Sequence, residues 1–159
     1  MDKIKQVIEA IEANTQEYIV IAIDGRCASG KTTLANKLAQ YFHANVFHMD
    51  DYFLRKEQRT KERLSEIGGN VDRERFIEEV ASKLHSDADI IFAPFDCKTI
   101  ALKEKRTVKQ THITIIEGSY AMHPLLRKYY DYMIYLTIDP QTQQKRLYER
   151  NPEKYDDFM

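Results

Sequence analysis

Apolar residues along the chain alternate between helical spacing and short continuous runs. Apolar side chains three and four positions apart predict amphipathic helices over residues 3–16, 32–43 and 74–85. Continuous apolar runs, the first of them rich in β-branched residues, predict buried strands over residues 18–23, 45–49, 113–116 and 132–136. Because strands alternate with helices, the pattern predicts a mostly parallel sheet covered on both faces, a three-layer α/β fold.

Two segments between these elements have a different character. Residues 52–70 are mostly charged or polar and end in Gly68 and Gly69, which predicts a mobile loop or a loosely held surface helix. Residues 88–110 contain two short apolar runs that we expect to pair as a hairpin, although Pro94 weakens the first run.

The end of the chain is expected to form one more helix. Asp139 and Pro140 have the residue types of a helix cap and a first helical turn, and Asn151–Pro152 is expected to end the helix, all within residues 140–159. No internal repeat divides the chain, so we expect a single domain over residues 1–159.

Composition and charge exclude several classes of protein. Of 159 residues, 43% are hydrophobic and 31% charged, which is ordinary for a globular domain. With a formal net charge of −1, the chain has no excess of basic residues of the kind that is typical of nucleic-acid binders. No apolar run reaches the roughly 20 residues that span a membrane. We also expect no secretory leader. Cys27 and Cys97 have no metal-ligand spacing and favour a reducing compartment, so we expect a cytoplasmic protein.

The clearest chemical motif directly follows the first predicted strand. Residues 25–32 fit the pattern G-x-x-x-x-G-K-[ST], between a strand and a helix, as phosphate binding requires. The backbone N–H groups and the helix N-terminus would hold phosphates, Lys31 would add a positive charge, and the Thr32 hydroxyl would bind Mg²⁺. We expect the ATP site to comprise Gly25, Arg26, Cys27, Ala28, Ser29, Gly30, Lys31, Thr32 and Thr33.

Acidic residues follow two of the other predicted strands. Asp50 and Asp51 end the second strand and Glu117 ends the third, so all three should share one crevice with the P-loop. One carboxylate could hold Mg²⁺ and another could accept a proton, which makes Thr32, Asp50 and Glu117 candidate metal ligands. The structural alternative is a solvated turn or a helix cap for Asp50 and Asp51, and a turn that ends the strand for Glu117.

Arg146 and Arg150 lie four positions apart on the last predicted helix and therefore share a face. They could stabilise the transferring phosphoryl group, or they could simply be exposed surface arginines.

Four stretches, taken together and in this order, resemble the uridine kinase-like family of P-loop nucleoside kinases. They are residues 25–32, Phe47 to Phe53, Ile116 to Gly118 and Tyr135 to Asp139. The resemblance spans nearly the whole chain and implies the P-loop NTPase fold. The P-loop is generic, and the Met-Asp-Asp-Tyr-Phe and Glu-Gly elements point to this family.

The resemblance also implies individual roles. Asp50 would activate the 5′-hydroxyl of the nucleoside, Glu117 would lie near the metal, and Asp72 would bind the ribose hydroxyls. Phe95 and Asp96 would lie beside the base. Tyr52 is a further candidate for the substrate pocket or for the core, and Arg146 and Arg150 fall in the family's lid.

The chain departs from the family in three respects. Glu149 lowers the arginine density of the lid. Phe95 stands where the family has Tyr, and a phenyl ring offers no hydroxyl to a base. Members also continue past the lid into another helix and a last core strand, whereas this chain stops at Met159, so we expect the sheet to lack that strand.

The leading hypothesis is therefore a kinase that uses ATP and Mg²⁺ to phosphorylate a hydroxyl of a small molecule, the 5′-OH of a nucleoside such as uridine. Two alternatives stay open. The acceptor could be another small alcohol, pantothenate-like or a sugar phosphate, or the chain could be an ATP-binding module without catalysis. We expect a small-molecule substrate and no nucleic-acid or membrane partner, and leave a homo-oligomer open.

Overall fold

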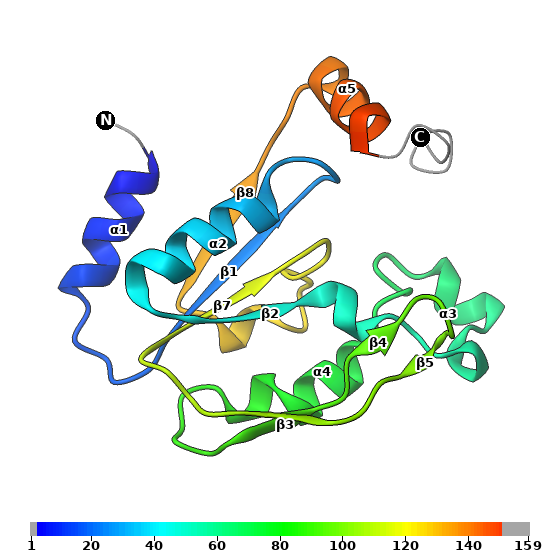
Figure 1. Cartoon of the computed structure of the whole chain (residues 1–159), viewed down its shortest axis with the longest axis horizontal. Coiled ribbons are helices and arrows are strands. Elements are labelled where there is room, and N and C mark those ends of the chain that lie inside the picture. The colour runs from blue at the N-terminus through cyan, green and yellow to red at the C-terminus, as the bar shows by residue number, and fades with distance from the viewer. Residues whose placement is uncertain (1–2, 151–159) are drawn as a thin grey trace.

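A computed structural model describes residues 3–150, and its centre is a four-stranded parallel sheet (Figure 1). The strands are β1 (Ile19–Gly25), β2 (Asn45–His48), β7 (Ile113–Glu117) and β8 (Tyr132–Leu136), in the order β2-β7-β1-β8. All three strand pairs are parallel. Every residue of β1 is buried, as the apolar run predicted for a strand covered on both faces.

Alternate residues of β1 belong to two separate hydrophobic cores, one on each face of the sheet. Ile19, Ile21 and Ile23 pack with residues of α1 (Lys3–Ala13) and α2 (Lys31–Phe42) on one face. Val20 and Ala22 belong to the core of the opposite face, which includes Phe76 of α4 (Arg73–Glu79) (Figure 1). The α/β fold with layers on both sides of a parallel sheet, predicted from the sequence, is thereby confirmed.

Two predicted helices are shorter than the apolar spacing indicated. α1 ends at Ala13, because the Asn14 side chain accepts the N–H of Gln16 and offers the backbone a turn instead. The helix predicted over residues 74–85 breaks after Glu79 and continues as the 3₁₀ turn η3 (Ala81–Lys83). A 3₁₀ turn still buries Ala81, which explains why the burial pattern alone did not show the break.

One short element ends at the first residue of the polar segment 52–70, and two more lie within the segment. The 3₁₀ turns η1 (Met49–Tyr52) and η2 (Lys56–Gln58) precede the short helix α3 (Lys61–Ser65), whose cap is Thr60. Arg63 connects this helix to the start of α4, since its guanidinium donates to the carbonyls of Gly69 and Val71 and pairs with Glu74.

The segment 88–110 forms the predicted hairpin in two stages. β3 (Ile90–Phe92) pairs antiparallel with β6 (Arg106–Val108), and β4 (Phe95–Asp96) pairs with β5 (Ala101–Leu102). Pro94 lies between β3 and β4, where a residue without an N–H interrupts the ladder.

The last described element is α5 (Pro140–Arg150), which follows β8 after a short connection. Asp139 caps it, because its carboxylate accepts both the N–H and the hydroxyl of Thr142. The preceding connection from β7 to β8 contains the 3₁₀ turn η4 (Arg127–Tyr129). Among the helices within residues 3–150, none has the length and apolar character needed to cross a bilayer.

Candidate active site

The turn between β1 and α2 has the backbone that the P-loop motif requires. Gly25 has φ 152°, and a Cβ there would lie 2.4 Å from the carbonyl oxygen of Leu136. Gly30 has φ 96° at the start of α2. These two positions therefore need glycine, which lets the loop curl against β8 and then enter the helix. The Lys31 ammonium donates to the carbonyls of Gly25 and Arg26, at 3.0 and 2.8 Å, and so folds back over the loop.

The structure brings the lysine, the threonine and two predicted acids together. Lys31, Thr32, Asp50 and Glu117 line one cavity of about 140 Å³, along with other residues of the P-loop. The Thr32 hydroxyl donates to Glu117 Oε2 at 3.4 Å. Asp50 reaches this cavity from η1 and Glu117 from the carboxyl end of β7, because the strands are parallel and end at one edge of the sheet. Asp51, expected in the same crevice, is not among the residues that line this cavity.

A histidine that the sequence analysis left without a role completes the surroundings of Glu117. His48 pairs with Glu117 across β2 and β7, and its Nδ1 lies 2.5 Å from Glu117 Oε1. Glu117 is only 4% exposed, so this contact gives a buried carboxylate a partner. The hydrogen bond with Glu117 raises the pKa of His48 above its ordinary value, against the effect of burial. The only signal in the sequence was a histidine at a strand end.

The surroundings of Asp50 raise the pKa of its carboxyl group above the ordinary value. Desolvation within the site and the nearby charge of Glu117 raise its pKa, and His48 and Lys31 partly oppose this shift. A carboxylate with a raised pKa is a stronger proton acceptor once ionised, which suits general-base chemistry.

A second acid next to the P-loop, Asp24, was missed by the sequence analysis. Its buried carboxylate accepts the N–H groups of Gly25, Tyr120 and Met122 at 2.6 to 3.2 Å. Asp24 thereby fixes the loop after β7 against the start of the P-loop. Tyr120 has φ 65°, an uncommon conformation for a non-glycine residue, which this hydrogen bond helps to hold. An aspartate that ends a buried strand gives no sequence signal for such contacts.

A larger cavity of about 850 Å³ opens beside the P-loop. Its lining includes Asp24, Arg26 and Asp50, together with Phe53, Asn70 and Tyr120. Asp50 also lines the smaller cavity that contains Lys31 and Thr32. The structure thus places one carboxylate at the junction of a phosphate-sized space and a space large enough for a small organic molecule.

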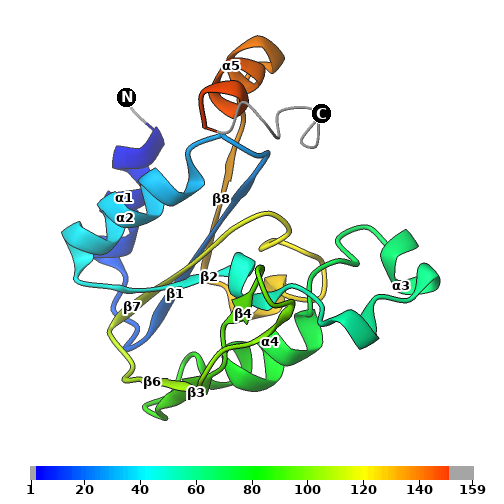
Figure 2. The ribbon, with the colours of Figure 1, turned by 45° about the vertical axis from the view of Figure 1, so that its right-hand side comes forward.

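Helix α5 lies directly over the P-loop (Figure 2). Arg146 donates to the carbonyl of Ala28 at 3.0 Å, and Gln143 donates to the carbonyl of Cys27 at 3.1 Å. Arg146 also lines a third cavity of about 550 Å³ with Ser29, Gly30 and Thr33, among others. Arg150 ends α5, and its side chain lies outside the described part of the chain.

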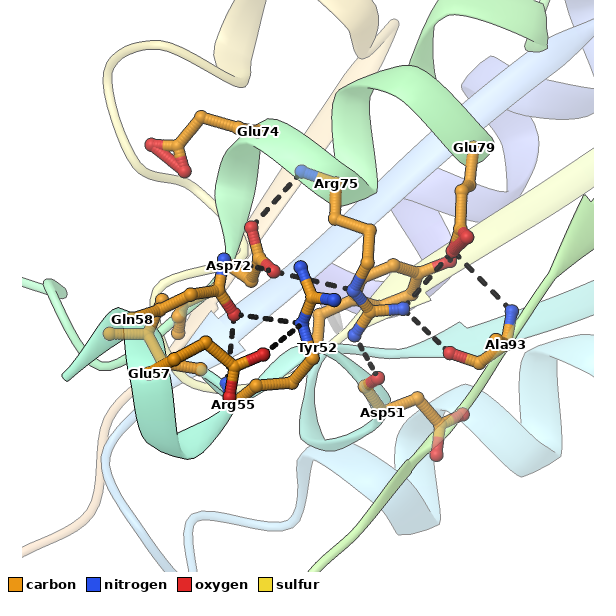
Figure 3. A network of polar contacts seen from close by, with 12 residues as sticks. Asp51, Tyr52, Arg55, Glu57, Gln58, Asp72, Glu74, Arg75, Glu79 and Ala93 are labelled. Atoms are coloured by element: carbon orange, nitrogen blue, oxygen red, sulfur yellow. Dashed lines mark hydrogen bonds and ion pairs between the residues drawn. The ribbon is translucent and has the colours of Figure 1, made fainter. Parts of the chain in front are cut away.

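Two predicted substrate residues are buried away from the two cavities that Asp50 lines. Tyr52 is fully buried and its hydroxyl donates to Glu79, so the structure places it in the core, one of the two alternatives for this residue. Asp72 is 1% exposed, caps α4 and accepts hydrogen bonds from Gln58 and Arg75 (Figure 3). In this conformation neither side chain lines the cavity beside Asp50.

The hairpin reaches the large cavity only indirectly. Phe95 is buried, and its ring lies edge-on to that of Phe53 with 6.0 Å between centroids. Phe53 in turn lines the cavity. Asp96 closes its own turn by accepting the N–H of Lys98, so its predicted contact with a base stays a prediction.

The donor set around the small cavity fits a magnesium ion that is shared with phosphates. Thr32, Asp50 and Glu117 offer hard oxygen ligands, the type that Mg²⁺ prefers. Within residues 3–150, no group of three or more His, Cys, Asp and Glu side chains could hold a metal by itself. Mg²⁺ commonly takes one or two protein oxygens and completes its shell with phosphate and water, so these three residues are compatible with it.

Comparison with known proteins supports this assignment of the loop. The curated protein Uridine kinase-like protein 4 of Arabidopsis thaliana is 24% identical over 156 residues, which cover 93% of this chain. The chain spans only 33% of that protein's length.

Solved structures share the fold over nearly the whole chain. A possible uridine kinase from Bacillus stearothermophilus matches with a TM-score of 0.72 and 26% identity, covering 98% of this chain and 91% of that one. A protein of Silicibacter sp. TM1040, provisionally named a fructose transport system kinase, matches with a TM-score of 0.75 and 23% identity, over 97% and 83% of the two chains.

The sequence also matches the family described as the KAP family P-loop domain, over residues 2–151. The motif at residues 25–32, its curled backbone and the parallel sheet behind it are what this description requires. With its resemblance to uridine kinase-like proteins confirmed by these relatives, the chain belongs to the KAP family of P-loop domains.

Proposed function

We propose that the protein is a kinase that transfers the γ-phosphoryl group of ATP to a hydroxyl of a small molecule. The position of Asp50 carries this proposal. Its carboxylate lies between the cavity that contains Lys31 and Thr32 and the larger cavity beside the P-loop. A group at that junction can contact an acceptor hydroxyl next to the phosphates, whereas a protein that only binds nucleotide would not need it.

Each residue of the site then has a chemical task. Asp50 would accept the proton of the acceptor hydroxyl, and its raised pKa favours that role. Lys31 and the N–H groups of the P-loop would hold the phosphates, and Arg146 would stabilise charge on the transferring group from its place over the loop.

Thr32 and Glu117, with Asp50, would hold Mg²⁺. The bound ion would neutralise charge on the β- and γ-phosphates. His48 would orient Glu117 through its hydrogen bond.

For the acceptor we propose the 5′-OH of a nucleoside such as uridine. Two relatives support this choice by name, a uridine kinase-like protein and a possible uridine kinase. The 850 Å³ cavity lies within the usual range for sites that bind small organic molecules. A pantothenate-like alcohol or a sugar phosphate is the second candidate, favoured by Arg26, a basic residue that lines the same cavity. The free cysteines Cys27 and Cys97 support a cytoplasmic location.

The test is transfer from radiolabelled ATP to a panel of nucleosides, pantothenate and sugar phosphates, with two variants. Lys31→Ala should abolish turnover, because the β- and γ-phosphates lose the positive charge of the lysine. Asp50→Asn should still bind ATP but lose transfer by about 100-fold or more, since an amide cannot accept the proton.

Asp51→Asn is the matched control, because it makes the same change at the neighbouring residue, which lines neither of the two cavities that meet at Asp50. It should retain most of the activity. Full turnover by Asp50→Asn would remove Asp50 from the proposed role, and tight ATP binding without any phosphorylated product would favour the non-catalytic alternative.

A further inference from the structure

One arginine outside the P-loop is buried in the centre of a polar network (Figure 3). Arg75, on α4, is 9% exposed and lies between two carboxylates, Asp72 at 3.3 Å and Glu79 at 3.1 Å. Its guanidinium carbon also lies 4.3 Å from the centre of the Tyr52 ring. A buried guanidinium is costly unless its charge and its N–H groups have partners, and each of the three guanidinium nitrogens of Arg75 donates at least one hydrogen bond.

Two further N–H groups of Arg75 donate to main-chain carbonyls of two different segments. Nη2 donates to the carbonyl of Asp51 at 2.9 Å, and Nη1 donates to the carbonyl of Ala93 at 2.6 Å. Asp51 directly follows Asp50, the proposed base. Ala93 precedes Pro94 and Phe95, so the hydrogen bond to its carbonyl holds the start of β4. Phe95 of β4 packs on Phe53, which lines the large cavity.

Arg75 is thus the single side chain, among the described residues, that donates hydrogen bonds to both of these segments. The planar fork of a guanidinium can reach two carbonyls in fixed directions while also contacting carboxylates, which a lysine ammonium cannot do in the same geometry. Glu79 also contacts both segments, since its Oε1 accepts the Tyr52 hydroxyl and the Ala93 N–H and pairs with Arg75. Arg75 and Glu79 therefore together set the relation between η1 and β4, and Arg75 supplies the hydrogen bonds to the main-chain carbonyls.

We propose that Arg75 is a positioning residue for phosphoryl transfer: it holds the Asp50-bearing turn η1 and the Phe95-bearing strand β4 in a fixed relation to each other. This inference rests on the proposed function. The alternative is that Arg75 only stabilises α4. A conservative substitution distinguishes the positioning role from the purely structural one. Catalysis depends on the position of a base to within about 1 Å, whereas the stability of the fold depends far less on that position.

A second arginine of this chain supplies the matched control. Arg63 likewise donates to two main-chain carbonyls, those of Gly69 and Val71, and pairs with a carboxylate, Glu74. None of these partners adjoins Asp50 or Phe95 in sequence. Arg63→Lys therefore removes the same kind of fork from the same part of the fold without removing a hydrogen bond to η1 or β4; Val71 bridges to Phe53, which follows η1.

The test compares Arg75→Lys with Arg63→Lys. Lysine keeps a positive charge beside Asp72 and Glu79, so Arg75→Lys should remain folded. We expect kcat for transfer to fall about 10- to 100-fold in Arg75→Lys, with ATP affinity unchanged, and to change less than about threefold in Arg63→Lys. Equal kcat in both variants at similar thermal stability would overturn the proposal.

A second readout does not depend on the proposed function. Amide hydrogen exchange should speed up in residues 50–52 and 93–96 of Arg75→Lys and stay at wild-type rates there in Arg63→Lys. If the wild type phosphorylates no acceptor, the proposed function fails, while faster exchange at both segments still supports their coupling through Arg75. Unchanged exchange at either segment would overturn that coupling.

Discussion

Among single residues, the buried Glu117 carboxylate has polar contacts with Thr32 and His48, and His48 is the partner whose charge depends on pH near neutrality. The raised pKa of His48 means that its folded form binds a proton more tightly than the unfolded chain, whose value is near 6.5. Its stabilising effect is therefore complete below that pH and declines as the pH rises through the folded pKa. His48→Leu should be less stable than the wild type at pH 5.5, and the difference should shrink toward pH 9.

Urea denaturation across that range measures the difference. His48→Asn is the control, since an amide can still donate to Glu117 but does not titrate. A gap between wild type and His48→Leu that widens with increasing pH would contradict the assignment.

Gly118 is a further residue whose identity the backbone geometry dictates. It has φ 140°, and a Cβ there would lie 2.7 Å from the Cβ of Met49, at the point where β7 approaches η1. Gly118→Ala should therefore cost about 1–3 kcal/mol of unfolding free energy through strain and the clash. Gly68→Ala is the comparison, because its φ of 70° is closer to an allowed region and its neighbour is the movable ring of Tyr120. Equal losses in the two variants would contradict the close approach of β7 and η1.

At the scale of elements, one aspartate joins the beginning of β8 to β1. Asp131 Oδ2 accepts the N–H of Val20 at 2.8 Å, and His85 contacts the same oxygen at 2.7 Å. Burial would raise the pKa of Asp131, but the hydrogen bonds from His85, Val20 and Gln16 together hold it below its ordinary value. The resulting stability is present above the unfolded value of 3.8 and is lost as the pH falls through the folded pKa.

Asp131→Ala should therefore lose about 1–3 kcal/mol at neutral pH, because the Val20 N–H also loses its charged partner. The loss should diminish as the pH falls below about 3.8. Asp131→Asn keeps an acceptor for Val20 and should lose less at neutral pH, and its loss should also diminish below that pH, because the titrating carboxyl is missing from both variants. Denaturation curves between pH 3 and pH 7 test both, and a loss in Asp131→Ala that persists unchanged to pH 3 would contradict the role of its charge.

The elements that could be predicted from the sequence are those set by local pattern. The runs at β1, β7 and β8 are apolar on both sides, and Asp139 with Pro140 marks the start of α5. The break after Glu79 could not be predicted, because a 3₁₀ turn buries the same side chains as a continued helix. Apolar spacing reports which residues are buried and says less about the exact backbone that buries them.

At the scale of the whole molecule, the site residues placed by the sheet topology could be predicted from the sequence, and the contacts made through loops could not. Asp50 and Glu117 could be expected near the P-loop, because parallel strands end at one edge of the sheet. The contacts of Asp24 and Arg75 connect positions distant in sequence through loops whose course no periodicity fixes. Asp72, assigned from the resemblance as a substrate ligand, has in the structure a partner in Arg75 that the sequence pattern did not reveal.

The two cavities that meet at Asp50 lead to a prediction about ligand-linked stability. A ligand that binds only the folded state stabilises it by about 2.7 kcal/mol at 100 times its Kd. A non-hydrolysable ATP analogue with Mg²⁺ should therefore raise the Tm of the wild type and leave Lys31→Ala unchanged. The true acceptor should raise the Tm further, and because both ligands contact the surroundings of Asp50, its effect should be larger with the analogue present than without it. Stabilisation by a sugar phosphate or pantothenate, with none by any nucleoside, would replace the nucleoside as acceptor while leaving the P-loop chemistry intact.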